Sequence, residues 1–159
     1  QTDAKRQPQV HYDDRLLLSA LISKRPVPIE MAENVPNGAA YDYTRRTVVV
    51  QRGMDGQDLF RCVSLAMARA ELDQAEHADP QADAFRGYCV SYMLCRKYGV
   101  DARGYDFSRL PESLRGADSQ TIRSELTDIR DTLQTMTGRM ERALEQSRAA
   151  AQKNGRKER

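Results

Sequence analysis

The pattern of apolar and polar positions predicts three short strands in the first third of the chain. Residues 47–51 form a β-branched run, which is the strongest strand signal in the sequence. Residues 27–31 and 39–43 are also expected to run extended, and residues 42–46 suit a hairpin connection. The pattern therefore predicts a small antiparallel sheet.

Helical spacing of apolar residues predicts three helices around or after this sheet. A short helix is expected over residues 13–24. Residues 55–75 are apolar around most of the helix circumference, so we expect this helix to be central and the most buried. A third helix over residues 79–98 should begin at the cap Asp79 and end before Gly99.

After the third helix the character of the chain changes. Residues 100–110 are expected to be irregular, with Tyr105 and Phe107 packing back on the domain. Residues 111–147 are predicted to hold a long C-terminal helix, capped at Asp118 or Ser119. The complete prediction is an α+β fold in which the sheet packs on a helix pair and the long helix follows.

The long helix carries an apolar seam whose members lie alternately four and three residues apart. This repeat of 3.5 residues is typical of a coiled coil or of a helix laid along a partner. Packing on its own domain is the other interpretation of the same pattern. The members of the seam are Ile122, Leu126, Ile129, Leu133, Met136 and Met140.

The length of this helix suggests how the seam is divided. A helix of about 40 Å should outrun a core of roughly 100 residues. We therefore expect residues 122–133 to dock on the core, and the seam from Met136 onward to pair with a protein partner, most simply in a homodimer.

Composition divides the chain into four parts and sets broad limits. Residues 1–12 are expected to be a disordered polar leader, 13–110 the domain, 111–147 the long helix and 148–159 a basic tail. The formal charge of +2, with acids and bases interleaved, gives no global field for nucleic acid. No apolar run approaches the roughly 20 residues that span a bilayer, and the three cysteines without a C-x-x-C pair favour the reducing cytoplasm.

The sequence lacks the motifs of the common catalytic and metal sites. Its two histidines are His11 and His77, and neither belongs to an H-E-x-x-H motif. No C-x-x-C and no phosphate-binding G-x-x-x-x-G-K occurs. We therefore expect neither a metal nor a cofactor, and no enzyme activity.

The order of several short motifs resembles a known family. The strand is followed by Arg52-Gly53-Met54, by a helix with Ala68-Arg69-Ala70-Glu71-Leu72, and by a helix from Phe85 to Tyr98. Gly99-Val100-Asp101 and Tyr105-Asp106-Phe107 come next. This order resembles the zincin-like domains of the ImmA/IrrE and ArdC antirestriction type, which occur in conjugation-associated proteins of Firmicutes mobile elements. The resemblance covers about residues 27–110.

The resemblance implies where a zinc site would stand. In that family one helix carries H-E-x-x-H, which places two histidine ligands four residues apart on one face. The next helix supplies a third ligand, a glutamate. Aligned on this chain, the histidines fall at Leu65 and Arg69, the first glutamate at Ala66 and the second near Tyr88.

These four replacements oppose zinc binding. Leu65 and Ala66 offer no donor atom or base, and the permanent charge of Arg69 repels a cation. The resemblance thus implies a non-catalytic binding or scaffolding domain derived from a metallopeptidase-like fold, in a mobile-element protein. Arg69 and Tyr88 either contact a ligand in the former cleft or simply fill it.

Two other functions stay open. The first is a hydrolase of unrecognised type. The second is a weak nucleic-acid-binding accessory domain, supported by the basic tail and by Arg139, Arg142 and Arg148.

Overall fold

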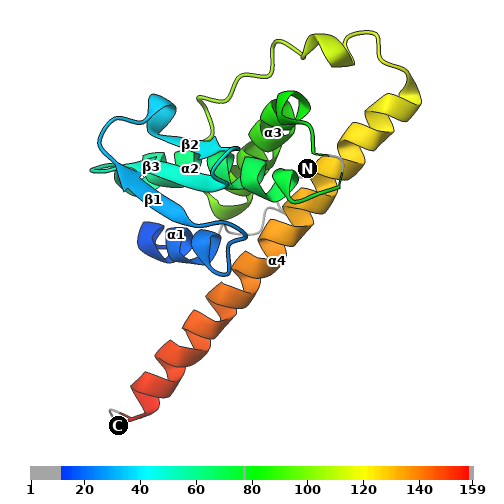
Figure 1. Cartoon of the computed structure of the whole chain (residues 1–159). Helices are drawn as coiled ribbons and strands as arrows, with labels where there is room; N and C mark the ends of the chain where they lie inside the picture. The colour runs from blue at the N-terminus through cyan, green and yellow to red at the C-terminus, as the bar shows by residue number, and fades with distance from the viewer. Residues whose placement is uncertain (1–11, 77, 158–159) are drawn as a thin grey trace.

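The β-branched run forms the central strand of a three-stranded sheet (Figure 1). The computed structural model describes residues 12–76 and 78–157. Strand β3 (Thr47–Gln51) lies between β1 (Ile29–Ala32) and β2 (Ala39–Asp42). Val48 of β3 is fully buried against the helices, so the strongest strand signal also marks the centre of the core.

The sheet is mixed rather than wholly antiparallel. Strands β2 and β3 form the predicted hairpin, in which the Asp42 carboxylate accepts hydrogen bonds from the N–H groups of Thr44 and Arg45, each at 3.0 Å. Strand β1 instead runs parallel to β3. It does so because the chain passes from β1 through a 3₁₀ turn, η2 (Pro36–Gly38), to the far edge of the sheet before it reverses into β3. The α+β class is confirmed, and the expected pairing is wrong for β1.

Helices α1 (Asp14–Ile22), α2 (Gly56–Asp73) and α3 (Pro80–Tyr98) agree with the predicted segments. The ends of α3 are set by local chemistry. The Asp79 side chain accepts a hydrogen bond from the N–H of Gln81 at 3.1 Å, as an N-cap does. Gly99 ends the helix in the left-handed region at φ 74°, which a glycine adopts without a steric penalty.

Helix α2 is the centre of the domain. It contacts α1, α3 and the long helix α4 (Ser119–Lys157), together with strands β2 and β3. Its small residues Ala66, Ala68 and Ala70 are almost completely buried. Their size lets these neighbours approach α2 closely, as the sequence predicts.

Helices α2 and α3 approach each other closely at Gly87. A Cβ atom added to Gly87 would lie 3.1 Å from Cγ of Arg69 and 3.7 Å from the carbonyl oxygen of Leu65. Beside this contact, the hydroxyl groups of Ser64 and Ser91 are 2.6 Å apart and buried. A small residue on α3 and a paired polar contact therefore fix the crossing.

Helix α4 is longer than predicted. It has 39 residues, which corresponds to about 58 Å, and it begins where the Asp118 carboxylate accepts a hydrogen bond from the N–H of Thr121 at 2.8 Å. It continues beyond residue 147 to Lys157, within the segment predicted as a basic tail. The reason is that Ala149, Ala150 and Ala151 strongly favour helix and no proline interrupts them.

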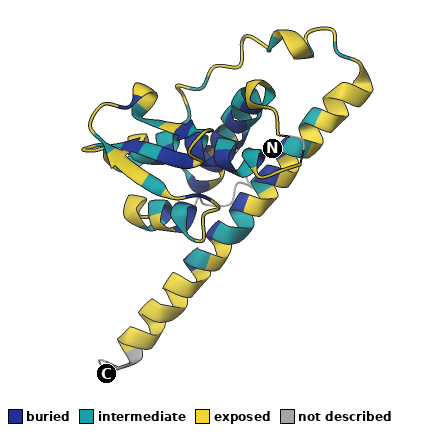
Figure 2. Cartoon of the chain, viewed as in Figure 1, coloured by how far each residue is buried: buried dark blue, intermediate teal, exposed yellow. Residues whose placement is uncertain are grey.

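The predicted division of the α4 seam is wrong. Ile122 and Leu126 are 42% and 59% exposed, whereas the middle of the helix is buried against the domain (Figure 2). The linker after α3 carries the chain past the end of that helix, so α4 reaches the core only after its first turns (Figure 1). The buried apolar residues of α4 are Ile129, Met136, Met140 and Leu144, and Thr132 is buried with them.

The predicted leader, residues 1–12, lies outside the described residues except for Tyr12, whose ring packs edge-on against Tyr98 with centroids 5.8 Å apart. His11 and His77 also lie outside them. Within the described ranges, no helix combines the length and the apolar character needed to cross a membrane.

The α2–α3 crossing generates a first prediction. Gly87→Leu should lower the free energy of unfolding by about 1–3 kcal/mol or more, because the added side chain forces two packed helices apart. Gly138→Leu is the matched control, since that glycine also lies inside a helix and an added Cβ would meet only the end of the Arg142 side chain at 3.5 Å. Urea denaturation of both variants measures the effect. Equal losses in the two variants would show that the crossing tolerates a larger residue.

Candidate functional site

The four positions that the resemblance assigns to a metal site lie in different environments. Leu65 of α2 and Tyr88 of α3 line one pocket of about 230 Å³, here called the α2–α3 pocket. Ala66 is 2% exposed and belongs to the core. Arg69 lies one turn after Leu65 on α2, and its side chain packs against Gly87 of α3. The other residues that line the pocket are Asn37, Arg61, Cys62, Gly104 and Tyr105.

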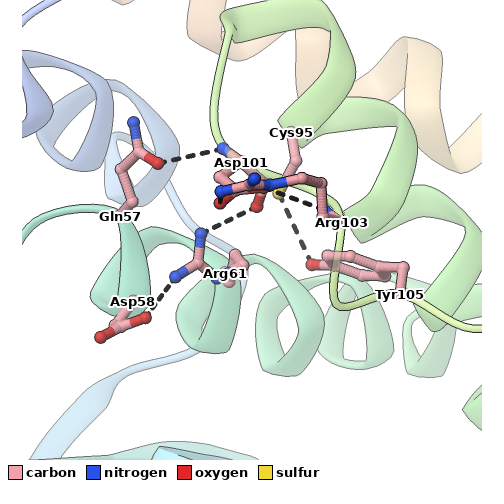
Figure 3. Close-up of polar contacts among 7 residues, drawn as sticks. All are labelled: Gln57, Asp58, Arg61, Cys95, Asp101, Arg103 and Tyr105. Atoms are coloured by element: carbon pink, nitrogen blue, oxygen red, sulfur yellow. Dashed lines mark hydrogen bonds and ion pairs between the residues drawn. The ribbon is translucent and has the colours of Figure 1, made fainter.

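Arg61 connects this pocket to the loop that follows α3 (Figure 3). Its Nη1 donates to the carbonyl oxygen of Asp101 at 2.8 Å, and its Nη2 pairs with Asp58. The side-chain oxygen of Gln57 accepts from the N–H of Asp101 at 3.0 Å. Hydrogen bonds from the Arg103 guanidinium hold the pKa of the Asp101 carboxyl below its usual range. These contacts fasten the loop to α2.

Aromatic side chains fasten the same loop to α3. The rings of Tyr88 and Tyr92 pack on Tyr105 and Phe107, with centroids 5.0–5.5 Å apart. The N–H of Asp106 donates to the Tyr88 hydroxyl at 2.6 Å. The expectation that Tyr105 and Phe107 pack back on the domain is confirmed.

The hydroxyl of Tyr105 completes a buried polar chain. It lies 2.6 Å from Oγ of Ser91 and 3.5 Å from Sγ of Cys95. Burial raises the pKa of Tyr105, and burial also raises the pKa of the Cys62 and Cys95 thiols. These groups are therefore neutral at pH 7, and the hydrogen bonds of Arg61, Tyr88 and Tyr105 are directed at the protein itself. Among the described residues, no three His, Cys, Asp or Glu side chains are grouped to hold a metal ion.

A second surface lies between α3 and the start of α4. It is an apolar groove of about 270 Å³, here called the α3–α4 groove. Four of its large apolar side chains stand 42–59% exposed: Met93, Leu110, Ile122 and Leu126. Burial raises the pKa of the Cys89 thiol, which lines the groove, to about 11, so this thiol is neutral at pH 7. The remaining lining residues are Phe85, Leu114, Glu125 and Ile129.

Arg86 fixes the two helical walls of this groove. Its Nε donates to Glu125 of α4 at 2.9 Å, and its Nη1 donates to Asp83 of α3 at 3.0 Å. Asp128 of α4 lies 3.6 Å from Nη2. Asp83 is 1% exposed, and this burial raises its pKa although Arg86 acts in the opposite direction. One guanidinium thus holds α4 to α3 beside the apolar surface.

Part of each site was visible in the sequence. Ile122 and Leu126 belong to the predicted seam, and Leu65 and Tyr88 are two of the predicted positions. The opposite wall of the groove was not predicted, although Leu110 and Leu114 are apolar residues in a mostly polar segment. Arg139, one of the arginines that favoured nucleic-acid binding, forms a largely buried ion pair with Glu71 of α2.

A scan against protein-family models and searches of curated proteins and of solved structures give no match to this chain. The resemblance to zincin-like domains therefore remains a prediction. What the chain does has to be inferred from the pocket and the groove themselves.

The Arg86 contacts generate a second prediction. Arg86→Met should lower the free energy of unfolding by about 3–5 kcal/mol at pH 7, because it leaves Asp83 and Glu125 without their cation. Asp83→Asn should cost about 1 kcal/mol or less, since Arg86 keeps two other carboxylates and a desolvated charge is removed.

This prediction also has a pH dependence. A carboxyl group whose pKa is higher in the folded than in the unfolded protein stabilises the fold when it is protonated. This stabilisation is full below the pKa of about 3.9 in the unfolded chain, and it is lost as the pH rises through the pKa in the folded protein. Losing Arg86 raises the pKa of Asp83 further. The deficit of Arg86→Met relative to wild type should therefore be small near pH 4 and grow toward pH 7 in urea denaturation. A pH-independent deficit would contradict it.

Proposed function

We propose that this chain is a non-catalytic protein-interaction domain that docks a partner in the α3–α4 groove. The observation that carries this proposal is the set of four exposed large apolar side chains that surround one groove with fixed helical walls. Contiguous exposed apolar surface of this kind marks interaction sites in soluble proteins. Ile122 and Leu126 of the predicted seam line this groove, although they were expected to dock on the core, whereas Met136 and Met140, which were expected to meet the partner, are buried in the domain.

The energetics favour a preformed docking surface. Burying a Leu or Ile side chain contributes roughly 1.5–3 kcal/mol, so Ile122 and Leu126 leave a substantial stabilisation for a partner to complete. The contacts of Arg86 with Glu125 and Asp83 hold both walls in place before binding. Preorganisation lowers the entropy lost when a partner binds. An apolar groove between helices is a common acceptor for an amphipathic helix.

The α2–α3 pocket supports the absence of catalysis. The Arg61 and Tyr88 side chains of this pocket are engaged in holding the loop after α3, and burial raises the pKa of its thiol, Cys62. A general base or nucleophile needs a group that is free to exchange a proton near neutral pH. We propose that this pocket is the remnant of a zincin-like cleft and that the chain belongs to a mobile-element or conjugation-associated protein. The three free cysteines suit a reducing compartment such as the cytoplasm.

Docking in the groove is tested with a designed helical peptide of about 16 residues that carries leucines along one face and uncharged glutamines on both flanks. The wild-type chain should bind it, measured by fluorescence anisotropy. Leu126→Ser should weaken binding about tenfold or more, because a tenfold loss corresponds to about 1.4 kcal/mol and an apolar contact of this size contributes at least that.

Met31→Ser is the matched control for Leu126→Ser. Met31 is 47% exposed but lies on strand β1, outside the groove. This variant should bind the peptide as wild type does. Equal weakening in both variants, or no binding by wild type, would contradict the proposed docking surface.

The zincin-like origin is tested by rebuilding a ligand set. Leu65→His, Arg69→His and Tyr88→Glu together restore three ligands and leave the buried Ala66 unchanged. If the chain descends from such a fold, this triple variant should bind zinc with micromolar or stronger affinity, measured by competition with a chelating dye. The triple alanine variant at the same positions is the control. A folded triple variant without zinc affinity would count against the resemblance.

A further inference from the structure

The charges around the α3–α4 groove are distributed unevenly. On α4, a helix of 3.6 residues per turn places Glu125 and Arg123 on opposite flanks of the stripe formed by Ile122 and Leu126. Glu125 points to α3, where Arg86 neutralises it. The outer flank of the groove on α4 is therefore basic.

The linker wall of the groove carries two arginines. Arg109 and Arg115 are exposed, and each adjoins an apolar lining residue, Leu110 or Leu114. Arg109, Arg115 and Arg123 form no ion pair with any carboxylate of the described residues. These three arginines, here called the arginine rim, are available to a partner.

The acidic groups near the groove differ in their surroundings. The Asp118 carboxylate caps α4 by accepting from Thr121. Asp128, whose side chain is 45% exposed, is near Arg86 on the inner flank. Glu112 lies between Arg109 and Arg115 in the sequence and is exposed, so it offsets part of the charge of these two arginines. A partner would thus meet positive charge on the outer side of the groove and apolar surface in its floor.

The shape and chemistry of the groove select among possible occupants. Apart from Glu125 its lining is apolar, and it includes Phe85 but no tyrosine or tryptophan, so it suits Leu, Ile and Met side chains better than nucleobases with their polar edges. A second copy of this chain would present the same concave surface, and two concave surfaces that face each other do not fill each other. A convex helix with an apolar stripe fills the groove, and carboxylates on its flank would meet the arginine rim.

We infer that the occupant of the α3–α4 groove is an acidic amphipathic helix of a partner protein. Its apolar residues enter the groove beside Met93, Ile122 and Leu126, and its carboxylates face the arginine rim. This inference rests on the proposed docking function and adds the charge and the secondary structure of the partner.

Three peptides with the same leucine face test the charge of the partner. Their flanks carry glutamate, glutamine or lysine, and binding to the full chain is measured by fluorescence anisotropy. The glutamate peptide should bind about tenfold more tightly than the glutamine peptide, as expected if three exposed ion pairs contribute about two- to threefold each. The lysine peptide should bind most weakly. Raising the salt concentration to about 0.5 M should largely remove these differences.

Charge reversal of the rim provides the complementary experiment. Arg109→Glu, Arg115→Glu and Arg123→Glu together should invert the order, so that the lysine peptide binds more tightly than the glutamate peptide. Arg148→Glu is the matched control: it changes an exposed arginine on the same helix, about 38 Å from Arg123 by helical rise and beyond the Debye length. This variant should keep the wild-type order.

The outcomes separate this inference from the proposed function. If the glutamine peptide binds and Leu126→Ser weakens it, but glutamate and lysine peptides bind equally, the acidic partner is wrong and the docking surface stands. If none of the three peptides binds, both are wrong. A homodimer in light scattering that Leu126→Ser dissociates would make a second copy the occupant. Displacement of the glutamate peptide from the chain by a DNA oligonucleotide would make a nucleic acid the occupant of the groove. Either of these two results overturns the inference.

Discussion

The burial of one side of α4 against α1 and α3 is the contact on which the rest of the structure depends. Met136 and Met140, each 1% exposed, close the core that α2 and the sheet begin. Polar contacts accompany this apolar strip along the helix. Glu125 bonds to Arg86 of α3, Arg139 pairs with Glu71 of α2, and the Tyr98 hydroxyl donates to Glu141 at 2.7 Å. The strip and its polar contacts together fix both the position and the rotation of α4.

The length of α4 determines what remains exposed. A helix of about 58 Å cannot be covered along its whole length by a domain of this size. The covered part lies in the middle, so the first turns, which lie beside α3 and the linker, leave Ile122 and Leu126 at the surface. Because α4 cannot rotate without exposing Met136 and Met140, Ile122 and Leu126 are held facing the linker and α3. The docking surface is thus a consequence of how the core is closed.

Local patterns in the sequence were sufficient for most elements. Asp79, Gly99 and the β-branched run fix the ends of α3 and the central strand through short-range chemistry. The direction of β1 and the part of the seam that docks depend instead on where the chain goes between elements, and no local pattern reports that path. Leu65 and Tyr88, which line one pocket, were singled out by the resemblance to the zincin-like domains and not by any local pattern. The groove joins residues from three separate segments, so sequence alone revealed its α4 wall and nothing else.

Chemical-shift mapping of Ile, Leu and Met methyl groups tests the docking surface most directly. Titration with an acidic amphipathic helix should shift the methyl signals of Met93, Leu110, Ile122 and Leu126, and should leave Leu65 beside the α2–α3 pocket unchanged. The buried methyls of Met136 and Met140 should also stay in place, because the walls of the groove are already formed. Shifts centred on Leu65, or a general change across the core methyls, would contradict a preformed docking groove between α3 and α4.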